Sequence, residues 1–276
     1  MAALFSLAAA AFFGAGDFCG AQASKRTTVI TVVAGSNVIG LVLVAALAPG
    51  MADRFDGGDF VAGMLGGLSG LIGITLLYRC LSTGPMAVVA PVAAVTNAAM
   101  PVLWGVNFGE QLTGLHLVGV AVGLVAIVLV SRPPEAAKPV TARLLAESTL
   151  AGIGFAGFFI VLDGTDHAAA PWPLVGGRLL TVLVLLVVLA VAPKARGGVR
   201  GAGRLILVCG LCDGGANVMM LEALGRGMLS LAAVLTSLYP AVTVILARTI
   251  LGEPISRGQV IGLVGALGAI SLIVGG

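Results

Sequence analysis

Ten apolar runs, each long enough to cross a lipid bilayer, make up most of this sequence. A membrane-spanning helix needs about 20 mainly apolar residues. Only 10% of the 276 residues are charged, against roughly 25% in a soluble domain, so a water-soluble surface cannot be built. The sequence therefore predicts an all-α polytopic membrane protein. Its expected spans are residues 2–22, 28–48, 60–79, 85–107, 113–131, 148–164, 172–192, 204–224, 228–250 and 258–275.

The two halves of the chain repeat one another. A shift of 143 residues places Phe12 on Phe155 and the Gly109-Glu110 step on Gly252-Glu253. Because each half holds five spans, an odd number, the second half must enter the bilayer from the opposite side. We therefore expect ten transmembrane helices in two inverted five-helix repeats. The predicted division is a first repeat at 1–131, a surface linker at 132–147 and a second repeat at 148–276.

Basic residues are concentrated in alternate connections. The odd-numbered connections, the linker included, carry eleven Lys and Arg residues, whereas the opposite side carries only Arg54 and Arg226. The positive-inside rule then predicts that the linker is cytoplasmic and that both termini are outside. We expect an integral protein of the bacterial cytoplasmic (inner) membrane. The eleven residues are Lys25, Arg26, Arg79, Arg132, Lys138, Arg143, Lys194, Arg196, Arg200, Arg204 and Arg257.

Each half ends in a Gly-Glu step followed by a glycine-rich final helix. The two segments read GEQLTGLHLVGVAVGLVAIVLV and GEPISRGQVIGLVGALGAISLIVG. In this pattern the chain resembles the EamA family of the drug/metabolite transporter superfamily over its whole length, although the first segment lacks the proline. The resemblance implies an exporter of amino acids, other metabolites or drugs. It also implies a central cavity lined by the first, third and fourth helices of each repeat.

Two aspartates lie inside the predicted spans. Asp213 shares a helix face with Asn217, four residues on, and has no oppositely charged residue nearby in the sequence. Asp17 lies in the first span. A charged residue at membrane depth costs a few kcal/mol, which makes it a candidate functional group. Since low dielectric favours the protonated carboxyl, either aspartate could couple transport to proton movement. The alternative is a packing role, with the carboxylate bonded to a nearby Ser, Asn or Arg.

The other candidate substrate-binding residues are polar or aromatic side chains in the predicted spans. Arg178 could neutralise an intramembrane aspartate, bind a substrate carboxylate, or extend to the membrane surface. Pro101 and Pro240 predict bends in the fourth and ninth spans, and bent helices in corresponding positions indicate a binding site. The remaining candidates are Tyr78, Asn97, Trp104 and Tyr239.

Several features are better explained by structure than by chemistry. Glu110 and Glu253 precede Thr113 and Ser256, which are suited to capping the next helix. Glu222 is expected to pair with Arg226 at the membrane surface. Glycines at helical spacing in the third and tenth spans predict close contacts between helices. The four cysteines, Cys19, Cys80, Cys209 and Cys212, lack the spacing of a metal site, so we expect no metal and no cofactor.

The favoured function is secondary transport of a small amino acid-like or drug-like metabolite, most simply export driven by protons. The sequence has no Walker motif, which argues against ATP as the energy source. The alternative is an intramembrane enzyme acting on a lipid-linked substrate, but the two histidines are far in sequence from the carboxylates. Expected partners are a small-molecule substrate, membrane lipid and protons, with no nucleic acid, in a monomer or homodimer.

Overall fold

The computed structural model describes residues 1–83, 86–131, 141–192, 196–252 and 254–276, without the side chains of 78, 81–83 and 86–87. The described residues contain helices and no strand. Ten segments among them are long and apolar enough to span a membrane, which confirms the predicted fold class. The helices are α1 (Ala2–Ser24), α2 (Val29–Met51), α3 (Gly57–Thr83), α4 (Met86–Asn107), α5 (Gly114–Ser131), α6 (Ala142–Asp163), the 3₁₀ turn η1 (His167–Ala169), α7 (Trp172–Val191), α8 (Gly203–Leu224), α9 (Leu229–Thr236), α10 (Tyr239–Leu251) and α11 (Arg257–Gly275).

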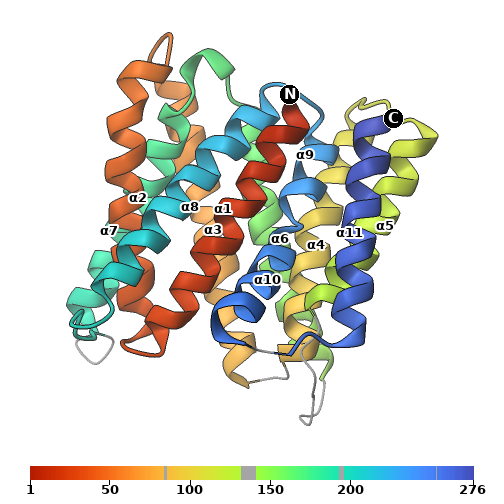
Figure 1. Ribbon diagram of the computed structural model, residues 1–276. Helices are drawn as coiled ribbons and strands as arrows, with labels where there is room; N and C mark the ends of the chain where they lie inside the picture. Colours follow the sequence, from red (N-terminus) through yellow and green to blue (C-terminus); the bar gives the residue numbers. More distant parts are fainter. Residues whose placement is uncertain (84–85, 132–140, 193–195, 253) are drawn as a thin grey trace.

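The helices run up and down between two faces of the bundle. Both chain termini lie at one end, which we call the terminal face, and the α1–α2 and α7–α8 connections lie at the opposite end, the linker face (Figure 1). Eight of the eleven predicted cytoplasmic basic residues are described, and they belong to the linker-face ends of helices or to its loops; Arg132, Lys138 and Lys194 lie outside the described residues. Arg54 and Arg226 lie at the terminal face.

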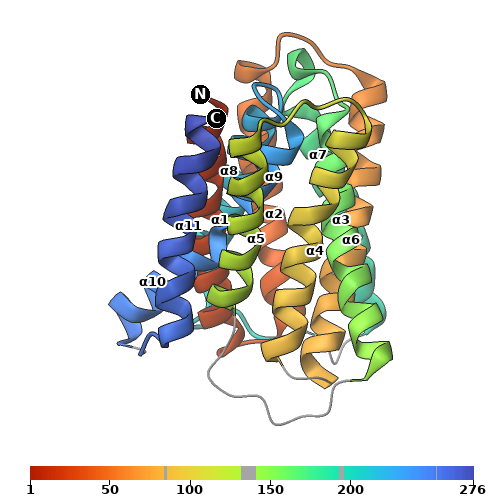
Figure 2. The same ribbon diagram turned by 90° about the vertical axis from the view of Figure 1, so that its right-hand side faces the viewer.

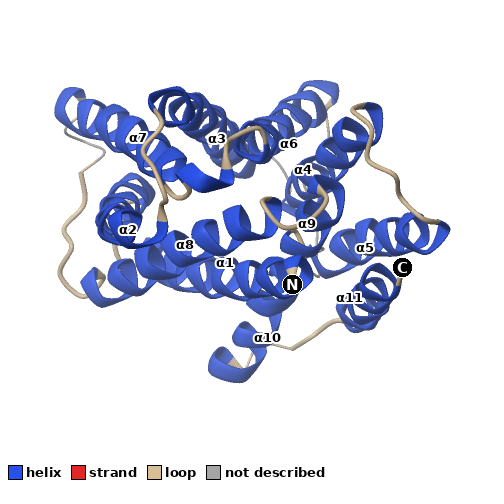
Figure 3. Cartoon of the chain, turned by 90° about the horizontal axis from the view of Figure 1, so that it is seen from above, coloured by secondary structure: helices blue, strands red, loops and turns tan. Residues whose placement is uncertain are grey.

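The helix contacts follow the two-fold relation expected of inverted repeats. With the 143-residue shift, α1 corresponds to α6, α2 to α7, and α3 to α8. Accordingly, α1 packs extensively on α8, and the corresponding pair, α6 and α3, does the same. In the same way, α2 packs on α8, and its counterpart α7 packs on α3. The α1–α8 pair is seen from above in Figure 3, where both helices run obliquely across the middle of the bundle. The final helices of the repeats, α5 and α11, pack against each other at one side of the bundle (Figure 2).

The sixth helix begins six residues earlier than the sequence analysis predicted. Thr141 caps it, because its hydroxyl accepts a hydrogen bond from the backbone N–H of Leu144 at 3.2 Å. The residues assigned to the end of the linker, from Ala142 to Glu147, are therefore helical. The helix starts with a polar first turn and a good N-cap. Hydropathy detects only the apolar part that follows, so the predicted start was too late.

The ninth span is broken rather than merely bent. It comprises α9 and α10, which are separated at Ser237 and Leu238. Pro240 has no N–H, so it cannot donate to the Thr236 carbonyl four residues earlier. Pro101 of the first repeat, which the 143-residue shift places four residues from Pro240, lies within a continuous α4. A discontinuous helix at membrane depth is tolerated only where protein or a cavity surrounds it.

Glycines bring the repeats into close contact, as their spacing predicts. A Cβ atom at Gly67 of α3 would lie only 2.6 Å from the Cα of Gly177 of α7. At this position no larger side chain fits without a shift of backbone. The same close approach fixes the position of Arg178, the residue that follows Gly177.

Candidate functional site

An ion pair between two helices of the second repeat lies inside the bundle. Arg178 Nη2 of α7 donates to Asp213 Oδ2 of α8 at 2.6 Å. Asp213 lies ten residues into α8, about 15 Å from the linker-face end of that helix. The Arg178 side chain is only 8% exposed and the Asp213 side chain 34% exposed. Of the three predicted roles of Arg178, the geometry matches neutralisation of an intramembrane aspartate.

Small residues make room for this pair. A Cβ at Gly214 of α8 would lie 3.2 Å from the Cα of Gly40 of α2, so the two helices approach closely. A Cβ at Gly40 would overlap the Arg178 guanidinium, which therefore lies directly against the α2 backbone. Asn217 donates from Nδ2 to the Asp213 carbonyl at 2.7 Å, and the same Nδ2 lies 3.5 Å from Asp213 Oδ1. Asp213 is thus held by both partners.

The hydrogen bonding of Arg178 is incomplete. Its Nε and Nη1 atoms are buried and have no hydrogen-bond partner among the described residues. A buried charged donor without a partner costs free energy, and a buried ion pair is itself weak support for stability. The pair is therefore poorly explained as a device that only stabilises the fold.

Asp17 lies beside Asp213. A Cβ at Gly16, the residue before Asp17, would be 3.5 Å from the Asp213 backbone nitrogen. Asp17 is seven residues from the end of α1, about 10 Å from the linker face. The two carboxylates are close enough for their negative charges to repel each other. The structure thus brings together Asp17, Arg178, Asp213 and Asn217 from three helices.

Asp17 projects toward the bundle interior and is nevertheless exposed. It continues a stripe at helical spacing that contains Ser6, Ala10 and Phe13. Ser6 and Ala10 are buried, and Phe13 packs against the core of the bundle. Ala21, one turn further along the stripe, is exposed as well, so the stripe opens toward the linker-face end of α1 from Asp17 onward. Among the described residues, Asp17 has no hydrogen bond or ion pair.

Three thiols surround the carboxylates. A Cβ at Gly20 would lie 3.2 Å from Cys209 Sγ, and one at Gly16 would lie 3.4 Å from the Cys212 Cβ. Cys19, on the same turn of α1, lies close enough to Cys209 and Cys212 to interact with both of these thiols electrostatically. No group of three His, Cys, Asp or Glu residues in the described part of the chain has the arrangement of a metal site.

A second polar cluster lies at the break between α9 and α10. Asn97 of α4 donates from Nδ2 to Ser237 Oγ at 3.3 Å. Asn97 Oδ1 and Thr236 Oγ1 are buried without a hydrogen-bond partner in the part of the chain that the structure describes. The structure therefore connects Asn97 to the broken span, but to none of the residues of the carboxylate cluster.

The aromatic candidates are dispersed. Trp104 is 44% exposed and stacks on Phe108, with ring centroids 4.2 Å apart, near the terminal-face end of α4. Tyr239 begins α10, and its ring centroid is 6.3 Å from that of Phe13, one turn from Asp17. The side chain of Tyr78 lies outside the described residues. Tyr239 is thus the aromatic candidate that packs against α1, the helix that carries Asp17.

The Gly-Glu steps differ in detail from the expectation. Glu110 accepts a hydrogen bond from the backbone N–H of Ser230 at 3.2 Å, at the start of α9 rather than of α5. An acidic group is favourable at this helix N-terminus as well. Thr113 and Ser256 cap α5 and α11 as predicted, by accepting from the N–H groups of His116 and Gln259. Glu253 lies outside the described residues.

Ion pairs connect the loops of the terminal face. Glu222 pairs with Arg226, as predicted. Arg54, in the loop after α2, pairs with Asp166, in the loop after α6, at 2.6 Å. Asp166 also accepts from the backbone N–H of Ala168 at 2.8 Å. This backbone hydrogen bond, together with Arg54, keeps the pKa of the Asp166 carboxyl below its usual value, and burial opposes the shift only in part.

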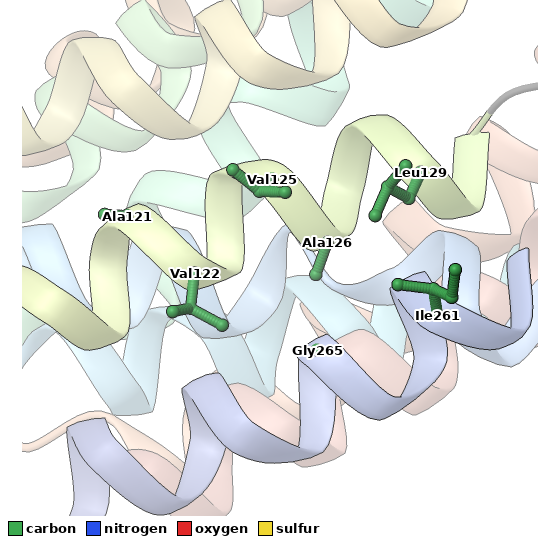
Figure 4. A pocket seen from close by; sticks show the side chains of 7 residues that line it. All are labelled: Ala121, Val122, Val125, Ala126, Leu129, Ile261 and Gly265. Carbon is green, nitrogen blue, oxygen red and sulfur yellow. The ribbon is translucent and has the colours of Figure 1, made fainter. Parts of the chain in front are cut away.

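An apolar hollow lies away from all of these groups. It has a volume of about 290 Å³ and lies between α5 and α11 (Figure 4). Its lining offers no charged side chain to a polar solute, and it is suited to hydrocarbon. The lining residues are Ala121, Val122, Val125, Ala126, Leu129, Ile261 and Gly265.

Sequence reasoning identified the charged residues but not their neighbours. The glycines that admit the guanidinium, Gly40 and Gly214, have no signal that distinguishes them from other packing glycines. The adjacency of Asp17 and Asp213 was also missed, because it depends on how α1 packs on α8.

The fold and the buried charges together define a membrane transport protein built from two inverted repeats. The EamA-like transporter family model matches residues 1–132 and again residues 144–275. The chain belongs to the EamA-like transporter family, and it is a membrane transporter of small solutes by that membership.

Comparison of structures agrees with this fold. Twenty-nine solved chains match. One, described only as "Crystal structure of protein", shares 19% sequence identity with a TM-score of 0.81, and the match covers 98% of this chain and 95% of that one. At this identity the likeness shows the fold alone. A search of curated proteins found no match.

Proposed function

We propose that the protein is a secondary transporter that exports a small metabolite in exchange for protons. The observation that carries the proposal is the group of Asp17, Arg178 and Asp213 at membrane depth, between helices of opposite repeats. Intramembrane charges of this kind mark substrate and proton pathways in transporters. Their position at the repeat interface is where inverted-repeat transporters hold substrate.

In the proposed mechanism, the two aspartates have different tasks. Asp213 is held by Arg178 and Asn217, and it keeps α7 and α8 in one arrangement. Asp17 has no such partner and can exchange protons. Protonation from outside would neutralise Asp17 when the site faces outward, and release toward the cytoplasm would accompany substrate binding. The repeats 1–131 and 148–276 would rock against each other between these states.

The direction of transport follows from the proposed orientation. Positive-inside bias supports a cytoplasmic linker face and an outer terminal face in the bacterial cytoplasmic membrane. Protons enter the cell down their gradient, so exchange with protons expels the substrate. The membership in a transporter family supports this interpretation over the intramembrane enzyme.

The test is solute flux into proteoliposomes that contain the purified full-length protein. A metabolite panel is assayed with and without an imposed pH gradient. We expect gradient-stimulated flux with the wild type and its loss with Asp213→Asn, because that change leaves the buried guanidinium without a counter-charge. Asp53→Asn, which removes an exposed carboxylate in the terminal-face loop after α2, is the control and should transport as the wild type does.

Two results would contradict the proposal. Equal gradient-driven flux by Asp213→Asn and wild type would show that the ion pair is not needed to hold α7 and α8 in the transporting arrangement. Chemically altered product, in place of displaced solute, would favour an enzyme.

A further inference from the structure

We propose that the substrate is an organic ammonium ion and that it competes with a proton for the carboxylate of Asp17. This inference rests on the proposed function and specifies the substrate class of the same site. It excludes free amino acids as preferred substrates, although the family resemblance would admit them.

The first argument is the balance of charge. The site contains two carboxylates, Asp17 and Asp213, but one cation, Arg178. Arg178 is committed to Asp213 by the 2.6 Å contact. A bare carboxylate at this depth is costly, so a proton or a bound cation must neutralise Asp17. Both ligands act on one group, and each therefore excludes the other.

Among the described residues, no other cationic side chain is placed to neutralise Asp17. The elements packed on α1 are α2, α8, α9 and α10. The α2 and α9 helices contain no ionisable residue. In α8 and α10, Arg204 and Arg248 lie at the linker-face ends, and Arg248 donates to the Gly252 carbonyl at 3.5 Å. The groups that remain near Asp17 are neutral or acidic: Cys19, Cys209, Cys212, Asp213 and Tyr239.

The second argument is the aromatic surface beside Asp17. Phe13 lies four residues earlier on the same stripe of α1, and its ring contacts that of Tyr239 from α10. The two helices are held together here, since Thr243 Oγ1 of α10 donates to the Gly14 carbonyl at 3.1 Å. A carboxylate next to aromatic faces favours a weakly hydrated organic cation through charge and cation–π attraction.

The third argument is the inaccessibility of Arg178. A substrate carboxylate would need free guanidinium N–H groups, but the side chain is 8% exposed and Nη1 lies against Gly40. The two unpartnered donors, Nε and Nη1, are themselves buried, so an anionic group does not reach them in this arrangement. The exposed charges of the site are therefore negative, and they select a positive ligand.

The experiment measures proton release on ligand binding. Purified full-length protein in weakly buffered detergent solution is titrated with phenyltrimethylammonium, whose charge is fixed and which cannot itself supply a proton. Wild type at a pH where Asp17 is protonated should release about one proton per bound cation. Asp17→Asn should release none and should not exchange the cation in proteoliposomes. Asp17→Glu should retain release, and Asp53→Asn should behave as wild type.

The outcomes separate this inference from the proposed function. Absence of phenyltrimethylammonium binding to the wild type, binding without proton release, or preference for phenylalanine or phenylpropionate overturns the ammonium proposal. If the wild type still moves such solutes under a pH gradient, the transport proposal survives. Conversely, cation binding with proton release but no flux of any solute supports the inference and contradicts transport.

Discussion

At the scale of single residues, the carboxylates of this chain differ in what neutralises them. Asp213 has a guanidinium at 2.6 Å, whereas Asp17 has no ion-pair partner among the described residues. The first arrangement holds a structure in place, because its charge is already balanced. The second leaves a charge that only a mobile ligand can balance, which is why a proton and a substrate are assigned to Asp17.

Asp166 offers a residue-scale test of the terminal-face loops. Its lowered pKa means that the ionised form stabilises the folded state. This contribution is fully present above the pKa of an unfolded aspartate, about 4, and is lost as the pH falls through the lower folded-state value. We therefore expect Asp166→Ala to lower the unfolding temperature by a constant amount from pH 5 to pH 7, approximately, and by less below pH 4.

The measurement is thermal unfolding in detergent across this pH range. Asp53→Ala in the opposing loop is the matched control, since the Asp53 carboxylate makes no hydrogen bond among the described residues. A difference between wild type and Asp166→Ala that grows toward acid pH would show that the assigned sign is wrong.

At the scale of helices, small residues decide how closely the repeats approach. Gly66 and Gly67 are adjacent in α3, but their surroundings differ. A Cβ at Gly67 meets the backbone of α7, whereas one at Gly66 would be 3.4 Å from the nearest atom, Val161 Cγ1. The first position tolerates no side chain, and the second has room for a methyl group.

We predict that Gly67→Ala destabilises the protein and that Gly66→Ala does not. Overpacking against backbone costs about 1–3 kcal/mol, which exceeds the gain in helix propensity from glycine to alanine. The readout is the midpoint of thermal unfolding in detergent, together with monodispersity on size exclusion. Equal midpoints for the two variants would mean that α3 and α7 do not approach as closely as the structure indicates.

At the scale of the whole molecule, an even number of spans places both termini on one side. The structure shows this arrangement directly (Figure 1). The positive-inside rule indicates which side this is. The linker face carries the basic residues, so that face is expected in the cytoplasm and the terminal face outside.

We therefore predict that both termini face the periplasm of a bacterial host. A C-terminal alkaline phosphatase fusion should be active, and a C-terminal green fluorescent protein fusion should be dark. Fusions truncated after Gly201, in the linker-face connection before α8, should show the reverse pattern. An active phosphatase at both positions would contradict the single orientation.

Much of this architecture was predictable from the sequence because the bilayer constrains it so strongly. Hydropathy located the ten spans, and the 143-residue shift indicated inverted repeats. Pro101 and Pro240 each predicted a bend, but only the span that contains Pro240 breaks. These features are local or periodic, so they can be read without knowing which helices touch. The start of α6 was placed too late, since a polar capped first turn has no hydropathy signal.

The site depended on tertiary packing. The sequence by itself determined that Asp17, Arg178 and Asp213 lie at membrane depth. A charge at that depth is costly, so each of these residues calls for a functional or structural explanation. Only the packing of α1 and α7 around α8 decided that Arg178 neutralises Asp213 and that Asp17 is left without a cation. The physical reason is that hydrophobicity sets the depth of a side chain along its own helix, whereas its charge partner depends on the rotation and separation of neighbouring helices, which residues such as Gly40 and Gly16 control.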